Sequence, residues 1–542
     1  MPPSIRQRHT FLVHQKFRDT PDSLRISREN VKLLEVPATR HDRISLDFRH
    51  LYEQDKDILG QIVNIRIEIV SADNYGHVSP FDRKVAWGSH IYVVPTKTTN
   101  WNKLCQWIHS VINPEIPCVG EETFITLPYA HYLYSTNTST ATLIARAANA
   151  YSEQPELQNL AFPSTTPEYL SLSLDKKTSD PKLRDVLVAE FYWSVGNWTS
   201  TFVPSERAHD HQVEVGLLGK LNDDENGELT FGGIIAVVGE NGQWVPTLFD
   251  FSPRHRSLAH PAVIDSHFRL PYGLHPKHVT TIKGDLTPPR SDPIVFADEE
   301  IAGEFANGHV EYEKVDCKLY AYYTLPNFIF VDKYQISDLA DAKAGGVNRV
   351  VGIWGETDLE IPVWIVDKWG SSMLLELVDP LPPASSGLPQ TLELEIPMHS
   401  RYEVPGWNQS VVKHDMPWPN VFWACSGAIE SELSLNPFDS KALGHERFFS
   451  EGTTFHYLTP NLSISRPGTG QQPNLKTTLD IPVVPLETYK YVQPWTVAVI
   501  VLGCLWIFYK TFLNFKKDGG IRRNPGVKPS KEKLEKKGPK TE

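Results

Sequence analysis

The segment Pro494–Phe515 is the feature that most constrains how this chain can fold. No charged residue lies between Val492 and Tyr509. An α-helix rises about 1.5 Å per residue, so roughly twenty apolar residues cross the hydrocarbon core of a bilayer. A β-strand rarely runs this far without interruption. The sequence therefore predicts a membrane-spanning helix over residues 493–515.

The residues that follow this segment predict which side of the membrane the tail occupies. From Lys510 to the end, eleven Lys or Arg stand against four acidic residues, a net charge of plus seven. Basic residues beside a membrane helix stay in the cytosol. This predicts a cytosolic tail over residues 516–542 and a lumenal or extracellular body. The alternative is a tail anchor with a cytosolic body, in which the basic tail would have to cross the membrane.

Length and charge describe a large acidic body. The chain has 542 residues and a formal charge of minus twelve, so removing the plus seven of the tail leaves minus nineteen. Such a body does not favour binding to nucleic acid. Its length is enough for two or three domains, each with its own core. A hydrophobic content of 40 % is that of a folded chain and not of a disordered one.

Sequons and cysteines bear on the compartment of the body. Four N-x-[ST] triplets begin before the membrane segment, at Asn137, Asn197, Asn408 and Asn461, and they are the predicted glycosylation sites. Of the five cysteines, Cys504 lies within the membrane segment. The other four are enough for two lumenal disulfides or for none.

The N-terminus raises an objection to a lumenal body. Residues 1–17, MPPSIRQRHTFLVHQKF, contain basic residues but no apolar core of seven or more, so they do not resemble a cleavable signal peptide. Insertion would then depend on the C-terminal helix, and a very long domain would have to cross the membrane after its synthesis. This consideration favours the tail-anchor alternative.

Alternating apolar and polar residues, which are typical of half-buried strands, dominate the first half. These patterns predict strands at residues 63–69, 90–94, 186–195, 212–218, 229–238 and 243–249. Asn241-Gly242 predicts a hairpin turn between the last two, because Asn-Gly accepts positive φ. Helical spacing is rarer and predicts short amphipathic helices at residues 101–112 and 142–151.

A proline-rich stretch at residues 246–289 places a domain boundary near its start. Beyond it, strands are predicted at residues 309–323, 328–331, 347–354, 361–366, 373–378 and 392–396. The predicted fold is mainly β, with two antiparallel β-sandwich-like lumenal domains, minor helix and one C-terminal transmembrane helix. The predicted divisions are the domains 1–250 and 251–463, a stalk 464–492, the helix 493–515 and the tail 516–542.

Four short segments follow one another in the second half. They are Leu325–Tyr334 (LPNFIFVDKY), Asp358–Pro362 (DLEIP), Ile396–Pro405 (IPMHSRYEVP) and Val421–Cys425 (VFWAC). In this order, before a C-terminal membrane helix, they resemble the PIG-X family, called the Pbn family in fungi. The resemblance covers the chain from about Leu258 to the membrane helix.

The resemblance implies a function. Members of that family are stabilising subunits of glycosylphosphatidylinositol (GPI) mannosyltransferase I in the endoplasmic reticulum. For this chain, the resemblance implies a non-catalytic, single-pass membrane glycoprotein without cofactor or metal. The partner that it implies is a multispanning PIG-M-type catalytic subunit. That partner transfers the first mannose from dolichol-phosphate-mannose to the anchor precursor on the lumenal side. Fungal members are known without a conventional signal peptide, which weakens the objection raised by the N-terminus.

The segments also name candidate residues, each either structural or partner-binding. They are Asp332, Tyr334, Pro362, His399, Arg401, Tyr402, Pro405 and Trp423. On a strand, His399 and Arg401 would share one face and Tyr402 the other. One interpretation places Tyr402 in the core and Arg401 in a structural ion pair, and the other makes them partner contacts. Trp423 beside Cys425 suggests a packed core strand, with Cys317 as the candidate disulfide partner.

Other clusters of reactive residues were weighed as sites. His209–His211 lacks the further ligands that zinc needs. Asn222–Gly227 begins like a calcium loop, but Gly233 stands at the twelfth position, where a glutamate is required. His260 and His267 have no partners for a catalytic triad. Fourteen tryptophans and twenty tyrosines leave a lumenal carbohydrate-binding protein or glycosidase as an alternative, and a broader lumenal folding chaperone is a third.

Overall fold

The computed structural model forms two compact units. It describes residues 5–16, 23–71, 80–81, 84–139, 167–175, 185–203, 211–221, 230–239, 241–257, 262–270, 273–289, 316–359, 361–380, 390–407, 409–426, 436, 438–439, 443–460 and 475–518. The first unit, here called the body, comprises Met1–Val404 and Val411–Pro482, and the second, here called the anchor unit, comprises Pro405–Ser410 and Val483–Glu542. The predicted helix at residues 142–151 lies outside the described residues.

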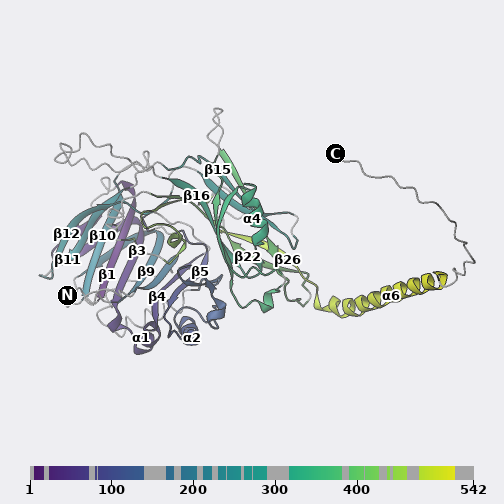
Figure 1. Ribbon diagram of the computed structural model, residues 1–542. Helices are drawn as coiled ribbons and strands as arrows, with labels where there is room; N and C mark the ends of the chain where they lie inside the picture. Colours follow the sequence, from purple (N-terminus) through teal and green to yellow (C-terminus); the bar gives the residue numbers. More distant parts are fainter. Residues whose placement is uncertain are drawn as a thin grey trace, which may run out of the picture. The chain divides into compact units, whose positions relative to one another are not determined.

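The first half of the body is one large sheet, of twelve strands among the described residues (Figure 1). Its order is β12-β11-β10-β1-β3-β9-β8-β4-β5-β7-β6, with β2 paired to β3. The strands are β1 (Ile5–Lys16), β2 (Leu24–Ile26), β3 (Val31–Asp47), β4 (Ile62–Val70), β5 (Gly88–Pro95), β6 (Ile125–Thr126), β7 (His131–Ser135), β8 (Tyr169–Asp175), β9 (Val186–Phe202), β10 (His211–Lys220), β11 (Phe231–Val238) and β12 (Trp244–Phe251). The mainly β prediction is confirmed, and the predicted strands of this half all lie within these elements or overlap them.

The strand β1 was not predicted, yet it lies inside the sheet. It pairs with β10 in parallel and with β3 in antiparallel orientation. Two arginines interrupt the run of apolar residues in this strand. Both bind Glu214 on β10: Arg6 Nη2 lies 2.6 Å and Arg8 Nε 2.7 Å from its carboxylate. The side chain of Glu214 is only 2 % exposed. Because the carboxylate is paired with two cations and hydrogen-bonded by both, its burial is compensated.

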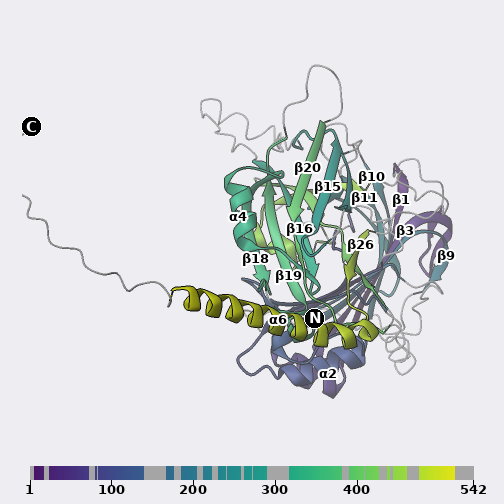
Figure 2. The same cartoon turned by 90° about the vertical axis from the view of Figure 1, so that its right-hand side faces the viewer.

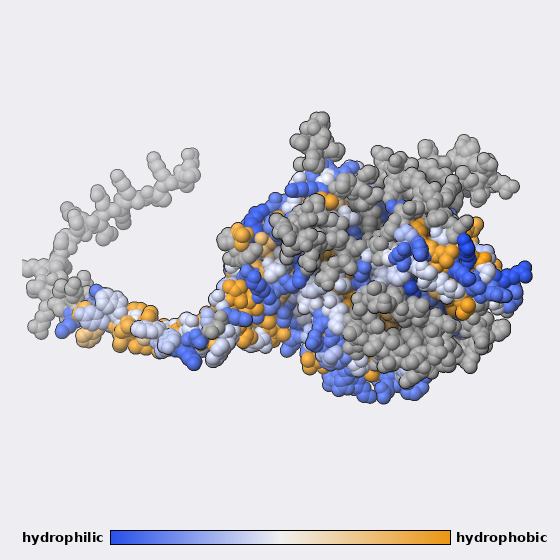
Figure 3. Space-filling view, turned by 180° about the vertical axis from the view of Figure 1, so that it is seen from behind, coloured by the Kyte–Doolittle hydropathy of each residue, from blue (hydrophilic) through white to orange (hydrophobic). Residues whose placement is uncertain are grey.

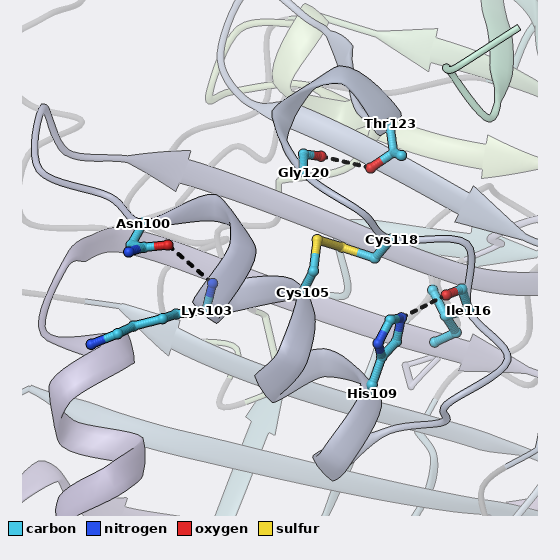
Figure 4. Close-up of a disulfide and its surroundings, with 8 residues drawn as sticks. All are labelled: Asn100, Lys103, Cys105, His109, Ile116, Cys118, Gly120 and Thr123. Atoms are coloured by element: carbon cyan, nitrogen blue, oxygen red, sulfur yellow. Dashed lines mark hydrogen bonds between the residues drawn. A yellow bond between two sulfur atoms is a disulfide. The ribbon is translucent and has the colours of Figure 1, made fainter.

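The predicted helix at residues 101–112 is present as α2 (Trp101–Val111). The side chain of Asn100 caps it by accepting a hydrogen bond of 3.1 Å from the backbone N–H of Lys103. A disulfide between Cys105 and Cys118 ties the buried face of α2 to the segment that follows it (Figure 4). The other described helical elements of this half are η2 (Phe48–His50), α1 (Glu53–Leu59) and η3 (Glu121–Thr123).

The second half of the body is a sandwich of two sheets (Figure 2), with orders β13-β24-β23-β16-β19-β18 and β20-β15-β14-β25. Side chains from both sheets, including Phe268, Ile282, Met373 and Trp423, form one core cluster. The strands are β13 (His255–Ser257), β14 (Val263–Arg269), β15 (Lys277–Gly284), β16 (Cys317–Pro326), β18 (Val347–Gly355), β19 (Gly370–Leu377), β20 (Gln390–Pro397), β23 (Asn420–Cys425), β24 (Thr454–Tyr457) and β25 (Thr459–Pro460).

Among the described residues, two small sheets and three helical elements complete this half. The pairs are β17 (Ile329–Phe330) with β21 (His399–Ser400), and β22 (Val411–Pro417) with β26 (Lys476–Pro482). The helical elements are α4 (Lys333–Asp341), η6 (Val363–Ile365) and η7 (His445–Phe448). Within the predicted stalk, residues 476–482 therefore form β26, while residues 464–474 lie outside the described part of the chain.

The strand predicted at residues 361–366 is wrong. Residues 363–365 form the 3-10 helix η6, in which the N–H of Ile365 donates to the carbonyl of Pro362 at 3.0 Å. The apolar residues that suggested a strand stay on the surface, since Trp364 is 55 % exposed and Ile365 59 %.

The two halves of the body share a core. Trp369, from the second half, belongs to the main cluster of the large sheet, and its indole N–H donates to the carbonyl of Tyr132 at 2.7 Å. The phenol of Tyr129 donates to the carbonyl of Gly444 at 2.7 Å. The predicted boundary at residue 250 falls at the end of β12, between halves that pack within one unit.

Three buried histidines predict how stability depends on pH. Burial lowers the pKa of His41, His90 and His255 to about 4, from an ordinary value of 6.5. Between these values the unfolded chain binds more protons than the folded body, so stability is lost as the pH falls through this window. A complete shift of this size is about 3 kcal/mol per histidine. We expect the Tm of the detergent-solubilised protein to be lower at about pH 5 than at about pH 7; an unchanged Tm would contradict this.

The anchor unit contains α6 (Leu486–Asp518), with Pro494 inside it. Among the described residues it is the one helix that is long and apolar enough to cross a membrane, over Leu486–Lys516. Apolar side chains follow much of its length (Figure 3). The membrane segment predicted at residues 493–515 lies within this helix.

Candidate docking surface

Three of the four segments singled out in the sequence meet around Arg401. Its side chain is buried, and its Nη1 donates to the backbone carbonyls of Asp358 at 2.6 Å and Ile361 at 2.8 Å. Its Nη2 lies 3.4 Å from the carbonyl of Glu356. The guanidinium stands 4.2 Å from the ring centroid of Phe330, a cation–π contact. One side chain thus joins segments that are far apart in the sequence.

Local pairing places Arg401 at this point. Phe330 in β17 lies opposite His399 in β21, and the N–H of Arg401 donates to the carbonyl of Phe328 at 2.8 Å. Burial lowers the pKa of the guanidinium, although Glu356 and Asp358 act in the opposite direction. The structure differs from the ion-pair interpretation, because these hydrogen bonds go to backbone carbonyls and not to a carboxylate.

The loop that Arg401 holds carries exposed apolar side chains. Its backbone is joined to the Ile396–Pro405 segment by a hydrogen bond of 3.1 Å from the N–H of Val363 to the carbonyl of Tyr402. We call the exposed set the motif patch: Leu359 (53 % exposed), Trp364 (55 %), Ile365 (59 %), Tyr402 (61 %) and Val404 (55 %). Tyr402 is therefore not a core residue. Contiguous apolar side chains on a surface mark sites of interaction.

The remaining residues of these segments have local structural roles or lie on the surface. Asp332 caps α4 by accepting a hydrogen bond of 2.9 Å from the N–H of Tyr334, whose own ring is 68 % exposed. Pro362 is the residue before η6. The Nδ1 atom of His399 lies 2.9 Å from that of His275; burial and this neighbour lower the pKa of His399.

Trp423, Cys317 and Cys425 lie in the core of the sandwich. Trp423 is 1 % exposed in β23, and Cys425 ends the same strand. Cys317 begins β16 directly opposite Cys425, and a disulfide joins the two. This fourth segment is therefore part of the packed interior, unlike the three that surround Arg401. Pro405, the last residue of the third segment, begins the anchor unit.

Two of the four sequons lie among the described residues. Asn197 is exposed in β9, opposite Pro37. The amide of Asn137 donates to the carboxylate of Glu115 at 2.6 Å and accepts from Asn113 at 2.7 Å. The other two, Asn408 and Asn461, lie outside the described part of the chain.

Of the residues considered for metal or catalytic sites, the structure describes His211 and His267. His211 is buried in β10, and His267 is half exposed, 3.7 Å from Asp265. His209, Asp210, His260 and the segment Asn222–Gly227 lie outside the described residues. In the part of the chain that the structure describes, no group of three or more His, Cys, Asp or Glu is arranged to hold a metal ion.

A buried cluster of ionisable residues joins the two halves of the body. Arg66 Nη2 lies 2.7 Å from Glu68 Oε1, and the phenol of Tyr169 donates to the same atom at 2.9 Å. Glu446, from the second half, acts on the pKa of both Arg66 and Glu68, and it lies 3.8 Å from His255. Arg66, Glu68 and Tyr169 are buried and hydrogen-bonded together, which is the arrangement of a structural network.

Comparison with known proteins decides the family. A family model described as PIG-X / PBN1 matches residues 271–512. The protein pbn1 of Emericella nidulans is 30 % identical over 566 residues, which cover 97 % of this chain and 100 % of that protein. The chain belongs to the PIG-X / PBN1 family. The part matched by the PIG-X / PBN1 model includes Arg401 and the whole motif patch, and this membership supports a role in GPI-anchor biosynthesis.

Other PIG-X / PBN1 relatives match to different extents. The protein pbn1 of Aspergillus oryzae is 28 % identical over 98 % of this chain and 99 % of its own length. PBN1 of Saccharomyces cerevisiae is 27 % identical over 58 % of this chain and 62 % of its own length. Among solved structures, the Fcho1 Mu homology domain of Danio rerio with bound Eps15 peptide matches with 8 % identity and a TM-score of 0.13, covering 89 % of this chain and 96 % of that chain. A likeness this low carries no argument.

Replacing Arg401 with alanine tests whether it holds the loop. We expect Arg401→Ala to lose about 3 kcal/mol of stability, because unpaired backbone carbonyls replace the present hydrogen bonds. Protease cleavage within residues 356–366 should increase with it. Thermal unfolding and limited proteolysis measure both effects. The matched control is Arg269→Ala, since Arg269 is 46 % exposed in its ion pair with Glu393, which is 48 % exposed, and its loss should cost less than about 1 kcal/mol. Equal stability of the two variants would contradict the assignment.

Proposed function

We propose that this protein is a non-catalytic accessory subunit that stabilises the endoplasmic reticulum GPI mannosyltransferase I, which adds the first mannose to the anchor precursor. Membership of the PIG-X / PBN1 family carries the proposal. The membrane-spanning helix α6 supports it, because the proposed partner is a multispanning PIG-M-type catalytic subunit in the same bilayer.

The proposed topology is a lumenal body and a cytosolic tail. Disulfides persist in oxidising compartments and are rare in the cytosol. The body contains Cys105–Cys118 and Cys317–Cys425, which supports the lumenal side. The basic residues of the tail support the same orientation. The tail-anchor alternative would place both disulfides in a reducing compartment.

The proposed contact with the partner is the motif patch. A binder stabilises a protein when it binds the folded form and not the unfolded one. Trp and Tyr dominate the binding energy of protein interfaces, and Trp364 and Tyr402 are both more than half exposed. Arg401 holds the loop that carries Trp364 against the segment that carries Tyr402 before any partner binds. Less conformational entropy is therefore lost when a partner docks. In this proposal the polar groups of the three segments build the loop, and its apolar side chains meet the partner.

A charged double variant of the patch tests the proposal. We expect Trp364→Asp with Ile365→Asp to recover about thirtyfold less partner from detergent-solubilised membranes, since a central aromatic anchor is worth about 2 kcal/mol or more. Partner abundance should fall, and precursor lacking the first mannose should accumulate. Pull-down, immunoblotting and lipid labelling measure these effects.

The control variant carries the same charges on another exposed apolar site. Val245 and Leu248 on β12 are 48 % and 74 % exposed, so Val245→Asp with Leu248→Asp should fold and retain the partner. Equal recovery by both double variants would exclude the patch as the contact. Recovery of many unrelated proteins would favour a general chaperone, and glycan binding or hydrolysis by the body would favour a lectin or glycosidase.

A further inference from the structure

We propose that the anchor unit ends in a membrane-surface foot, in which Trp407, on a loop of residues 405–407 and 409–410 beside the start of α6, reaches the headgroup layer of the bilayer with its side chain. The foot is defined by its exposed apolar residues, Trp407, Val484, Tyr489 and Tyr491. The partner that these residues contact is the lipid of the bilayer. This inference does not depend on the proposed mannosyltransferase partner.

Two backbone hydrogen bonds hold the loop against the juxtamembrane segment. The carbonyl of Gly406 accepts from the N–H of Leu486 at 3.1 Å, and the carbonyl of Ser410 accepts from the N–H of Val483 at 2.9 Å. The loop is distant from α6 in the sequence, yet it belongs to the same compact unit. The first residue of the helix and the residue before Trp407 are therefore direct neighbours.

The exposed side chains have the chemistry of a headgroup layer. Trp407 is 67 % exposed, Tyr489 48 % and Tyr491 69 %. Glu487 and Lys490 alternate with these aromatic residues. Trp and Tyr concentrate where apolar and polar surroundings meet, because their rings are apolar and their N–H or O–H groups are polar. The combination fits neither a purely aqueous surface nor the hydrocarbon core.

The length of the helix places the loop at the right depth. A hydrocarbon core of about 30 Å takes roughly twenty helical residues, and each headgroup layer adds about 5–8 Å. If the core begins at Val492, Leu486 lies six residues earlier, about 9 Å along the helix axis. Gly406, bonded to Leu486, is then just beyond the outer boundary of the headgroup layer. The indole of Trp407 is within one side chain's length of the lipid headgroups.

Continuity with the membrane segment favours lipid over a protein partner. Tyr491 and Val492 lead directly into the apolar run of α6, whose side chains are exposed and need a lipid or protein environment. Trp407 extends that apolar surface onto a loop bonded to the same helix. A bilayer covers both parts without any further chain.

The test measures the environment of position 407 in the full chain. Trp407→Cys is made in a Cys504→Ser background, because Cys504 is the free cysteine and the other four form disulfides. A nitroxide label is attached, and the protein is reconstituted alone in phosphatidylcholine vesicles. Electron paramagnetic resonance then compares collisions with oxygen, which enters apolar phases, and with a water-soluble nickel chelate.

The control is Leu248→Cys, at an exposed apolar position on β12. We expect the oxygen-to-nickel collision ratio at position 407 to be at least about threefold that at position 248, because only position 407 meets an apolar phase. Tyr491→Cys in the same background reports whether α6 is inserted. A high ratio at 491 with a ratio at 407 equal to that at 248 would overturn the proposal. The same result is expected if Trp407 docks a protein, since no partner is present in these vesicles.

Discussion

Deletion of residues 1–16 is expected to leave no folded body. The deletion removes β1 from between β10 and β3, together with Phe11 and Leu12, which are at most 1 % exposed. Truncating one buried Phe to Ala costs about 3–5 kcal/mol, and a domain has about 5–15 kcal/mol in total. Glu214 would also lose Arg6 and Arg8 as partners, which leaves an unpaired buried charge.

Protein abundance in membranes and trypsin resistance of the body measure this loss. Deletion of residues 1–4, which stops before β1, is the control and should leave both unchanged. A trypsin-resistant body in the 1–16 deletion would contradict the expectation. The same argument predicts that the mature protein retains these residues, so a peptide containing Phe11 should be found by mass spectrometry of the purified protein.

Removal of the Cys317–Cys425 disulfide is expected to cost about 4 kcal/mol, because it closes a loop of 108 residues and long loops lose the most chain entropy when closed. It joins β16 to β23 in the sandwich core. The double variant Cys317→Ser with Cys425→Ser should therefore lower the Tm. Thermal unfolding without reductant measures the effect.

The second disulfide supplies the comparison. Cys105–Cys118 spans 13 residues, so its removal should cost about 2 kcal/mol less than removal of the longer one. An unchanged Tm after loss of Cys317–Cys425 would contradict the expectation. Alkylation of all four cysteines in the protein as isolated would contradict both disulfides and remove their support for a lumenal body.

The strands that were predicted correctly share one property. In β4, for example, isoleucines at positions 65, 67 and 69 alternate with polar residues, so the period of two is visible in the residues themselves even though Arg66 and Glu68 are buried and paired within the strand. The strands β1 and β3 were missed because runs of polar and charged residues, Gln7–Thr10 and Thr39–Asp42, are buried in them and interrupt the alternation. Asp42 on β3, for example, is paired with His9 on β1 at 2.9 Å. Such pairing joins residues that the sequence does not place together.

At the candidate docking surface, too, the sequence named the residues but not their burial. The sequence singled out Arg401 and Tyr402, but it could not say which of them is buried. In the structure Arg401 turns inward to the carbonyls of the 356–362 loop, and Tyr402 remains 61 % exposed. Trp364 and Ile365 lie in the apolar run 361–366 that predicts a strand, and their place on the surface emerged only from η6.

The sequence by itself determined the membrane segment, because a mainly apolar stretch with Lys510 as its one charged residue between Val492 and Lys516 has one stable environment, and its recognition needs no other part of the chain. It also determined the mainly β character, through alternation within single strands. The tertiary structure alone decided that Pro405–Ser410 hydrogen-bonds to the start of that membrane helix, and that Arg401 builds the motif patch. Both depend on backbone groups meeting across long sequence separations, and every residue offers such groups whatever its side chain.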